Sequence, residues 1–163
     1  TLYLLTQHPE ILQKLRQEID IGERADYIVA TFKEGLRLFP TIPSIPRIAL
    51  RDVTLAGFTI PKSAKLFISI YLVHRHPEFW REANVFQPER FLETSQPKAY
   101  IPFGLGERYC LGKNLATLQG HLLLELFVKE FDYELVDENV QPKVTVSLYP
   151  RDGMKMKVES RKQ

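Results

Sequence analysis

The sequence is poor in cysteine, and Cys110 is the only one among its 163 residues. A single thiol excludes a disulfide within the chain and a zinc site built from several cysteines. No run of apolar residues approaches the ~20 that a membrane-spanning helix requires, and the formal net charge is only +2. The sequence therefore indicates neither a transmembrane segment nor a nucleic-acid partner.

The beginning of the chain lacks two further signals. It has no initiating methionine, and "TLYLLTQHPE" has neither the basic region nor the cleavage site of a signal peptide. The apolar turn "LYLL" is typical of the end of a helix already under way. We therefore expect a fragment of a longer protein. Its localisation stays open: the protein could lie in the cytoplasm, or it could be anchored to a membrane through a segment that precedes Thr1.

What is present is an ordinary globular composition, with 44% hydrophobic and 26% charged residues. A chain of this length can bury one well-formed core. No linker, repeat or low-complexity tract divides residues 1–163, so we expect them to form part of one domain. Helical spacing of apolar residues predicts three main helices, at 8–20, at 25–39 and from 111 to 126.

Short strands are predicted between and after these helices. Alternating apolar residues and turn signals place them at 53–60, with a turn at Gly57, at 66–70, at 144–148 and at 154–158. The stretch from 75 to 104 is rich in proline and aromatic residues without a regular period, which indicates a packed irregular segment. The expected fold class is mainly α with small β-sheets (α+β).

Two helix faces carry specific expectations. A leucine stripe should be almost wholly buried, and it consists of Leu111, Leu115, Leu118, Leu122 and Leu126. In the helix at 25–39 the apolar stripe runs through Ala25, Ile28 and Phe32, which puts Glu34 on the opposite side. Periodicity alone therefore predicts that Glu34 and Arg37 form an exposed ion pair of little energetic value.

The stretch "FGLGERYCLG", residues 103–112, places the cysteine where a loop meets a helix. Free backbone N–H groups and the positive end of the helix dipole favour an anion there, so a thiolate is expected. Gly104, Gly106 and Gly112 allow positive φ angles and the close approach of a flat group. Arg108 is a planar cation suited to a carboxylate. A haem would offer its iron to the sulfur and its propionates to the guanidinium.

Other readings of the cysteine remain open at this point. A lone cysteine is most often a small buried apolar side chain. A catalytic thiol needs a base, and His121 lies about three turns along the following helix. Zinc would need more ligands than one cysteine and four scattered histidines supply.

The loop resembles the haem-binding signature of the cytochrome P450 family, Phe-x-x-Gly-x-Arg-x-Cys-x-Gly. All five fixed positions match, and they are Phe103, Gly106, Arg108, Cys110 and Gly112. The resemblance implies the C-terminal, haem-ligating part of a cytochrome P450 fold, which lacks the central helix that serves oxygen activation.

Further stretches resemble the same family. "KEGLRLFP" is similar to its Glu-x-x-Arg helix, and "FQPERF" to its Pro-Glu-Arg-Phe segment. This implies a buried structural cluster of Glu34, Arg37 and Arg90. "PRIALRDVTLAGFTIPKSA" resembles a strand region in which Arg47 would meet a haem propionate. "LVHRHPEFWREANVFQPERF" resembles the run before the loop, with His76 where an aspartate is more usual.

The resemblance implies a haem b cofactor with the Cys110 thiolate as axial ligand of the iron. The other implied cofactor-binding residues are Arg47, Phe103, Gly104, Gly106, Arg108, Leu111, Gly112 and Ala116. The substrate contacts it implies are Ile42, Ser44, Ile45, Ser147 and Leu148. Leu111 and its neighbours would be core first and cofactor wall second, and Phe103 could pack in the core or on the sulfur side of the haem.

The parent protein would be a monooxygenase that inserts one atom of O₂ into a small, lipophilic organic substrate. A reductase or ferredoxin would supply the electrons. Lys98, Lys113 and Arg75 could belong to a basic surface for such an acidic partner, although scattered lysines more often form only a solvated face. The alternative is a truncated haem-binding or non-catalytic piece without turnover of its own. No catalytic residue beyond the haem ligand is expected within this chain.

Overall fold

The computed structural model describes residues 1–22, 26–93 and 98–161. Its helices are α1 (Leu2–Thr6), α2 (Pro9–Ile21), α3 (Asp26–Leu38), α4 (Ile70–Val73) and α5 (Lys113–Glu130), with 3₁₀ turns η1 (Pro88–Phe91) and η2 (Gly106–Arg108). Its strands are β1 (Ser44–Ile48), β2 (Val53–Leu55), β3 (Phe58–Ile60), β4 (Lys65–Ser69), β5 (Phe131–Leu135), β6 (Pro142–Val144), β7 (Leu148–Pro150) and β8 (Met156–Ser160).

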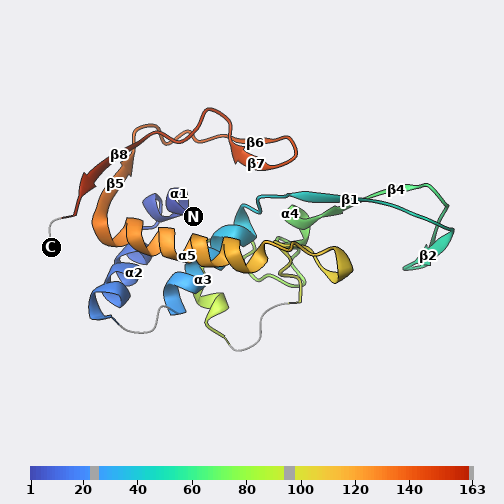
Figure 1. Cartoon of the computed structure of the whole chain (residues 1–163), viewed down its shortest axis with the longest axis horizontal. Helices are drawn as coiled ribbons and strands as arrows, with labels where there is room; N and C mark the ends of the chain where they lie inside the picture. Colours follow the sequence, from blue (N-terminus) through green and yellow to red (C-terminus); the bar gives the residue numbers. More distant parts are fainter. Residues whose placement is uncertain (23–25, 94–97, 162–163) are drawn as a thin grey trace.

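The strands form small antiparallel pairs rather than one sheet. These pairs are β1 with β4, β2 with β3, β5 with β8, and β6 with β7. Figure 1 shows the β1–β4 ribbon extending from one end of the molecule, while α5 crosses its middle beside α2 and α3. The expected mixture of helices and small sheets is confirmed.

The predicted helices form for local reasons that the structure makes visible. In α2, Pro9 occupies the first turn, Ile11 and Leu15 are buried, and Gly22 ends the helix at a φ of +71°. A side chain of another helix accepts hydrogen bonds from the N–H groups in the first turn of α3. Glu18, on α2, accepts hydrogen bonds from the backbone N–H of Tyr27 at 2.9 Å and of Ile28 at 3.2 Å. Ala25, the predicted start of this helix, lies outside the described residues.

The helices bury two separate clusters of side chains, one on each side of α3. The larger cluster joins α1, α2, α3 and α5 through Leu5, Leu15, Ile28, Leu124 and Val128. The smaller one joins α3 to the irregular segment through Ala30, Trp80, Phe91 and Ala99. Because α3 is covered on both sides, it positions the segment that leads to the cysteine loop.

The leucine stripe of α5 is not buried, contrary to the expectation. Leu111 is 93% exposed, and Leu115, Leu118, Leu122 and Leu126 are 54–62% exposed. The helix turns a different face, with Leu124 and Val128, toward α2 and α3. Periodicity finds an apolar face but does not say which of two apolar faces the rest of the described chain covers.

The strands near the middle of the chain follow the sequence closely. β2 and β3 form the predicted hairpin, with a turn in which Ala56 and Gly57 have φ angles of +49° and +84°. The strand predicted at 66–70 is β4, which pairs with β1. Its last predicted residue, Ile70, instead begins α4, because the Ser69 hydroxyl accepts a hydrogen bond from the Leu72 N–H at 3.3 Å and caps that helix.

The tail differs from the prediction. Residues 144–148 do not form one strand, because the chain reverses there and β6 pairs with β7, with Val144 opposite Leu148. The last strand, β8, pairs instead with β5, a strand that the apolar pattern did not reveal. Within the described residues, no helix combines the length and apolar character needed to cross a bilayer.

Gly120 provides a test of the α3–α5 contact. A Cβ atom there would overlap the ring of Phe32. Gly120→Ala should therefore lower the free energy of unfolding by about 1–3 kcal/mol, the usual cost of overpacking, despite the better helix propensity of alanine. Urea unfolding measures the change. In a Phe32→Ala background the same substitution should be neutral or stabilising, and equal losses in both backgrounds would contradict this packing.

Candidate functional site

The cysteine loop is a set of nested turns between the irregular segment and α5. The Gly104 N–H donates to the Ile101 carbonyl at 3.0 Å, and the Cys110 N–H donates to the Phe103 carbonyl at 2.9 Å. Gly104 and Gly106 have φ angles of +76° and +74°. Other residues rarely adopt such angles, so these two glycines fix the path that presents the cysteine.

Cys110 is a free, exposed thiol at the end of this loop. Helix α5 begins three residues later, at Lys113, whose N–H donates to the Cys110 carbonyl at 3.2 Å. Gly112 lies beside the sulfur, because a Cβ atom at that position would be 3.8 Å from the Cys110 Sγ. The sulfur is therefore open to a ligand and bordered by a position without a side chain, which suits an iron that approaches in a flat ring.

Two guanidinium groups belong to the same region. Arg108 ends η2, is exposed, and has no hydrogen bond or ion pair with the other described residues. Arg47 lies on β1 and donates to the Pro46 carbonyl at 2.9 Å. Ile45, two residues earlier and so on the same face of the strand, has its Cδ1 3.4 Å from a Cβ built at Gly104. β1 thus brings the face that carries Arg47 against the loop.

The predicted substrate contacts come from two segments that the backbone joins. The Leu148 N–H donates to the Thr41 carbonyl at 2.8 Å, which ties the β6–β7 hairpin to the chain that follows α3. Ile42 is exposed, whereas Ser44, Ile45, Ser147 and Leu148 are half-buried. The five residues therefore come from neighbouring segments, and Ile45 lies next to Gly104 of the cysteine loop.

Phe103 and the first turns of α5 have different surroundings. Phe103 is half-buried and lines a cavity of about 320 Å³ between the loop, α3 and α5, with Leu36, Thr117 and two lysines, Lys33 and Lys113, on its walls. Burial, and then the charge of Lys113, lowers the pKa of Lys33. Leu111 and Ala116, by contrast, are exposed.

The alternative roles of the cysteine find no support in these contacts. The ring of His121 packs edge-on against Phe32, with centroids 5.0 Å apart, about 16 Å along the helix from the loop. Among the described residues, no three His, Cys, Asp or Glu side chains gather closely enough to hold a metal ion. Cys110 is also exposed rather than buried.

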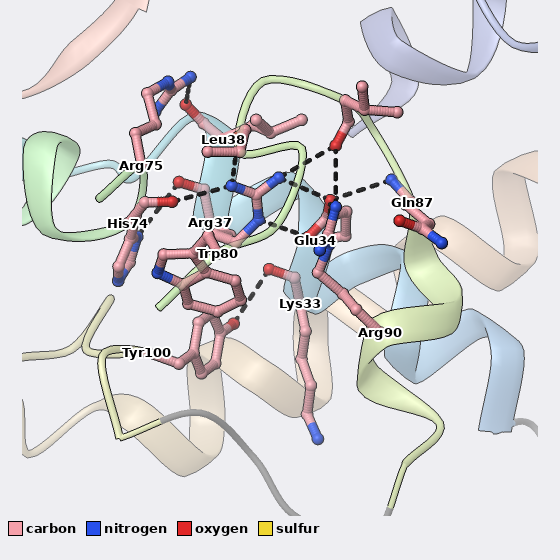
Figure 2. Close-up of polar contacts among 12 residues, drawn as sticks. Lys33, Glu34, Arg37, Leu38, His74, Arg75, Trp80, Gln87, Arg90 and Tyr100 are labelled. Carbon is pink, nitrogen blue, oxygen red and sulfur yellow. Dashed lines mark hydrogen bonds and ion pairs between the residues drawn. The ribbon is translucent and has the colours of Figure 1, made fainter. Parts of the chain in front are cut away.

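The charged residues Glu34, Arg37 and Arg90 meet in the interior (Figure 2). Glu34 and Arg37 are both 0% exposed, and Arg37 donates to both carboxylate oxygens of Glu34 at 2.7 Å. Arg90 donates to Glu34 Oε1 at 3.1 Å, and so does the Gln87 N–H at 2.9 Å. The exposure that periodicity predicts for Glu34 is wrong, because α3 has a polar buried face in addition to its apolar one.

Arg37 uses all five of its N–H groups. Two of them meet Glu34, and the other three donate to backbone carbonyls of His74 at 2.8 Å, Ala83 at 2.6 Å and Val85 at 3.1 Å. The guanidinium also lies over the ring of Trp80, 5.0 Å from its centroid. Arg37 thus binds the backbone at the residue that follows α4 and at two positions within the irregular segment.

His74 is a buried residue that the sequence did not single out. Its Nδ1 lies 3.1 Å from the Arg37 carbonyl, and its Nε2 accepts a hydrogen bond from the Ile101 N–H at 2.8 Å. Burial, reinforced by the charges of Arg37 and Arg75, lowers the pKa of His74 to about 4. No apolar period marks this position, and only the apolar residues directly before it, Leu72 and Val73, could have suggested burial.

Removal of the Glu34 carboxylate tests the charge cluster. Glu34→Ala would leave the buried guanidinium of Arg37 without its counter-charge, so the free energy of unfolding should fall by about 3–5 kcal/mol. Urea unfolding measures the loss. The matched control is Glu134→Ala, which breaks an exposed ion pair with Lys157 and should change stability little. Similar losses in the two variants would contradict the assignment of a buried cluster.

The depressed pKa of His74 predicts an acid dependence of stability. The His74 side chain binds a proton near pH 6.5 in the unfolded protein but only at about pH 4 in the folded protein. Stability should therefore decline as pH falls through this window, by up to ~1.4 kcal/mol per unit from this group. Unfolding at several pH values should show a shallower decline for His74→Gln, and no such change for the exposed His76→Gln. Identical slopes in all three proteins would contradict a neutral, buried His74.

Known proteins resemble the chain in sequence over nearly its whole length. The sequence model described as "Cytochrome P450" matches residues 1–158. Cytochrome P450 3A5 of Homo sapiens is 34% identical, over an alignment that covers 99% of this chain and 36% of that protein. Iridoid oxidase of Catharanthus roseus is 36% identical, with 80% of this chain and 29% of that protein covered.

Solved structures agree in fold. The crystal structure of the cytochrome P450DA heme domain has a TM-score of 0.87 at 29% identity, covering 99% of this chain and 40% of that one. Retinoic acid bound cyanobacterial CYP120A1 has a TM-score of 0.87 at 30% identity, covering 97% of this chain and 40% of that one. The chain thus spans about a third of the curated relatives cited and two fifths of these structures. It belongs to the cytochrome P450 family, a family of haem proteins.

Proposed function

We propose that this chain holds a haem b through the Cys110 thiolate, as the C-terminal part of a single P450 domain. The observation that carries the proposal is the exposed thiol, presented by a loop with two glycines at positive φ beside two arginines. Bound there, a haem supplies an iron that can activate O₂, and a thiolate ligand donates electron density that favours O–O cleavage.

The residues of the chain have distinct roles in this proposal. Arg108 and Arg47 bind the propionates, because both guanidiniums retain free donors next to the loop. Gly112 leaves space beside the sulfur, and the exposed Leu111 and Ala116 give the ring an apolar surface. Phe103 lines the cavity between the loop, α3 and α5, where it packs the loop against these helices.

The activity we propose for the whole protein is the insertion of one oxygen atom of O₂ into a small lipophilic substrate. Ile42, Ile45 and Leu148 provide apolar contacts for that substrate, and Ser44 and Ser147 lie beside them. The Leu148–Thr41 hydrogen bond holds the two segments together. Electrons come from a reductase or ferredoxin, and Lys33 and Lys113 beside the loop favour an acidic donor.

Substitution of the thiol tests the proposed ligand. The haem-loaded protein, reduced and exposed to CO, should show the red-shifted Soret band of a thiolate ligand, and Cys110→Ser should lose that band because a hydroxyl is a much weaker ligand. Absorbance spectroscopy measures it. A thiolate-type band that survives the substitution would overturn the assignment of Cys110.

The propionate contacts are tested separately. Arg47→Gln and Arg108→Gln should each weaken haem binding by about 1.5–3 kcal/mol, the usual contribution of a hydrogen bond to a charged group. Haem titration measures the affinity. Arg51→Gln, at an exposed position after β1, is the matched control and should bind haem like the parent. Equal affinities for all three variants would contradict the proposed roles of the arginines.

A second candidate function is haem binding without turnover. The chain spans 31% of bovine cytochrome P450 3A28 and 36% of human cytochrome P450 3A5, so turnover, a property of the whole protein, is tested apart from haem binding. An assay of substrate oxidation by the haem-loaded chain with a reductase separates the two candidates. Product formation that depends on Cys110 would support the monooxygenase, whereas the thiolate spectrum without product would support binding alone.

A further inference from the structure

His74 lies beside the charge cluster (Figure 2), where its ring faces the Arg37 carbonyl. It also contacts the start of the cysteine loop, through the Ile101 N–H. The side chain is fully buried, with 0% of its surface exposed. Its backbone carbonyl accepts a hydrogen bond from Arg37, its Nδ1 faces the Arg37 carbonyl, and its Nε2 faces the Ile101 N–H. The imidazole of His74 therefore contacts the backbone at the end of α3 and at the start of the cysteine loop.

The geometry allows only one protonation state of this ring. The Arg37 carbonyl is an acceptor, so Nδ1 must carry a proton, and the Ile101 N–H is a donor, so Nε2 must not. No carboxylate pairs with the ring among the described residues, and the charged groups near it are the guanidiniums of Arg37 and Arg75. A neutral imidazole with a fixed tautomer thus satisfies every group that faces it, and the lowered pKa agrees with this.

Two further hydrogen bonds connect Ile101 with the cysteine. The Ile101 carbonyl accepts the Gly104 N–H, which forms the first turn of the loop, and the Phe103 carbonyl accepts the Cys110 N–H. These bonds within the loop set its shape. The bond from Ile101 to His74 Nε2, by contrast, comes from another part of the chain and fixes where the loop begins.

Aromatic contacts hold the imidazole still. The ring of Tyr100 stacks on that of His74, with centroids 5.5 Å apart and planes inclined by 21°, and Trp80 packs against it at 6.3 Å. The Tyr100 hydroxyl donates to the Lys33 carbonyl of α3 at 3.1 Å. Tyr100 directly precedes Ile101, so stacking fixes one residue and the hydrogen bond fixes the next.

We propose that His74 is a positioning residue for the thiolate ligand, which sets the place of the cysteine loop relative to α3 through the Ile101 N–H. This inference rests on the proposed haem ligation by Cys110. Its chemistry is that of a hydrogen-bond acceptor: any group that accepts at the place of Nε2 should preserve the position of the loop, and any group that does not accept there should loosen it.

Two amide substitutions at His74 test the roles of its two ring nitrogens separately. Asparagine can reproduce the donor at Nδ1 but is too short to reach Ile101, whereas glutamine can place its oxygen where Nε2 lies. His74→Asn should therefore raise the rate of haem loss about tenfold, the effect of one lost hydrogen bond, and lower the fraction of ferrous–CO protein with the thiolate-type Soret band. His74→Gln should stay within about twofold of the parent.

The control is the same pair of changes at His76, an exposed histidine two residues further on. His76→Asn and His76→Gln should leave the haem-loss rate and the spectrum as in the parent. Hydrogen exchange of the Ile101 amide is the direct measurement, and it should be slow in the parent and in His74→Gln but fast in His74→Asn.

The outcomes distinguish this inference from the proposed function. If the parent lacks a thiolate-type band, or keeps one after Cys110→Ser, the haem ligation itself is wrong. If that ligation holds but His74→Asn and His74→Gln behave alike, whether both like the parent or both impaired, the role of the Nε2 acceptor is overturned. The exchange of the Ile101 amide can be followed even in a variant that loads haem poorly, so weak loading does not hide the result.

Discussion

The buried guanidinium of Arg37 is the interaction on which the rest of the structure depends. Between α4 and the cysteine loop, the described residues have little regular structure beyond η1, so many of their carbonyls lack the partners that a helix or sheet supplies. Arg37 donates to three of them, at His74, Ala83 and Val85, while Glu34 balances its charge and binds Gln87 and Arg90. The irregular segment can pack against α3 because one side chain of that helix supplies hydrogen bonds that a regular helix or sheet would otherwise provide.

Such a cluster is costly in free energy and is best understood through the geometry that it defines. Two charges removed from water gain little net stability over a well-packed apolar pair. What the pair at Glu34 and Arg37 provides is a single arrangement, since each donor has one acceptor within 3.1 Å. The smaller apolar cluster around Trp80 and Phe91 then packs on a segment whose path is already fixed.

Sequence reasoning succeeded where a feature depends on near neighbours in the chain. The β2–β3 hairpin and the course of α2 follow from alternation, glycine and proline, and the family follows from five residues within the loop. It failed where partners come from afar. Glu34 is buried by residues more than fifty positions later, His74 is satisfied by Arg37 and Ile101, and β5 finds its partner in β8. Periodicity along one element carries no information about such contacts.

The cysteine loop unites both kinds of determinant. Its shape is local, because Gly104 and Gly106 at positive φ and the Cys110–Phe103 hydrogen bond lie within ten residues. Its place is not local, because Ile101 is held by His74 and Ile45 approaches Gly104 from β1. A ligand loop transplanted without α3 and β1 would keep its turns but lose its position. In the proposed haem site that difference would matter, because Cys110 on the loop would hold the iron and Arg47 on β1 would hold a propionate, and only the distant contacts set the separation of these two residues.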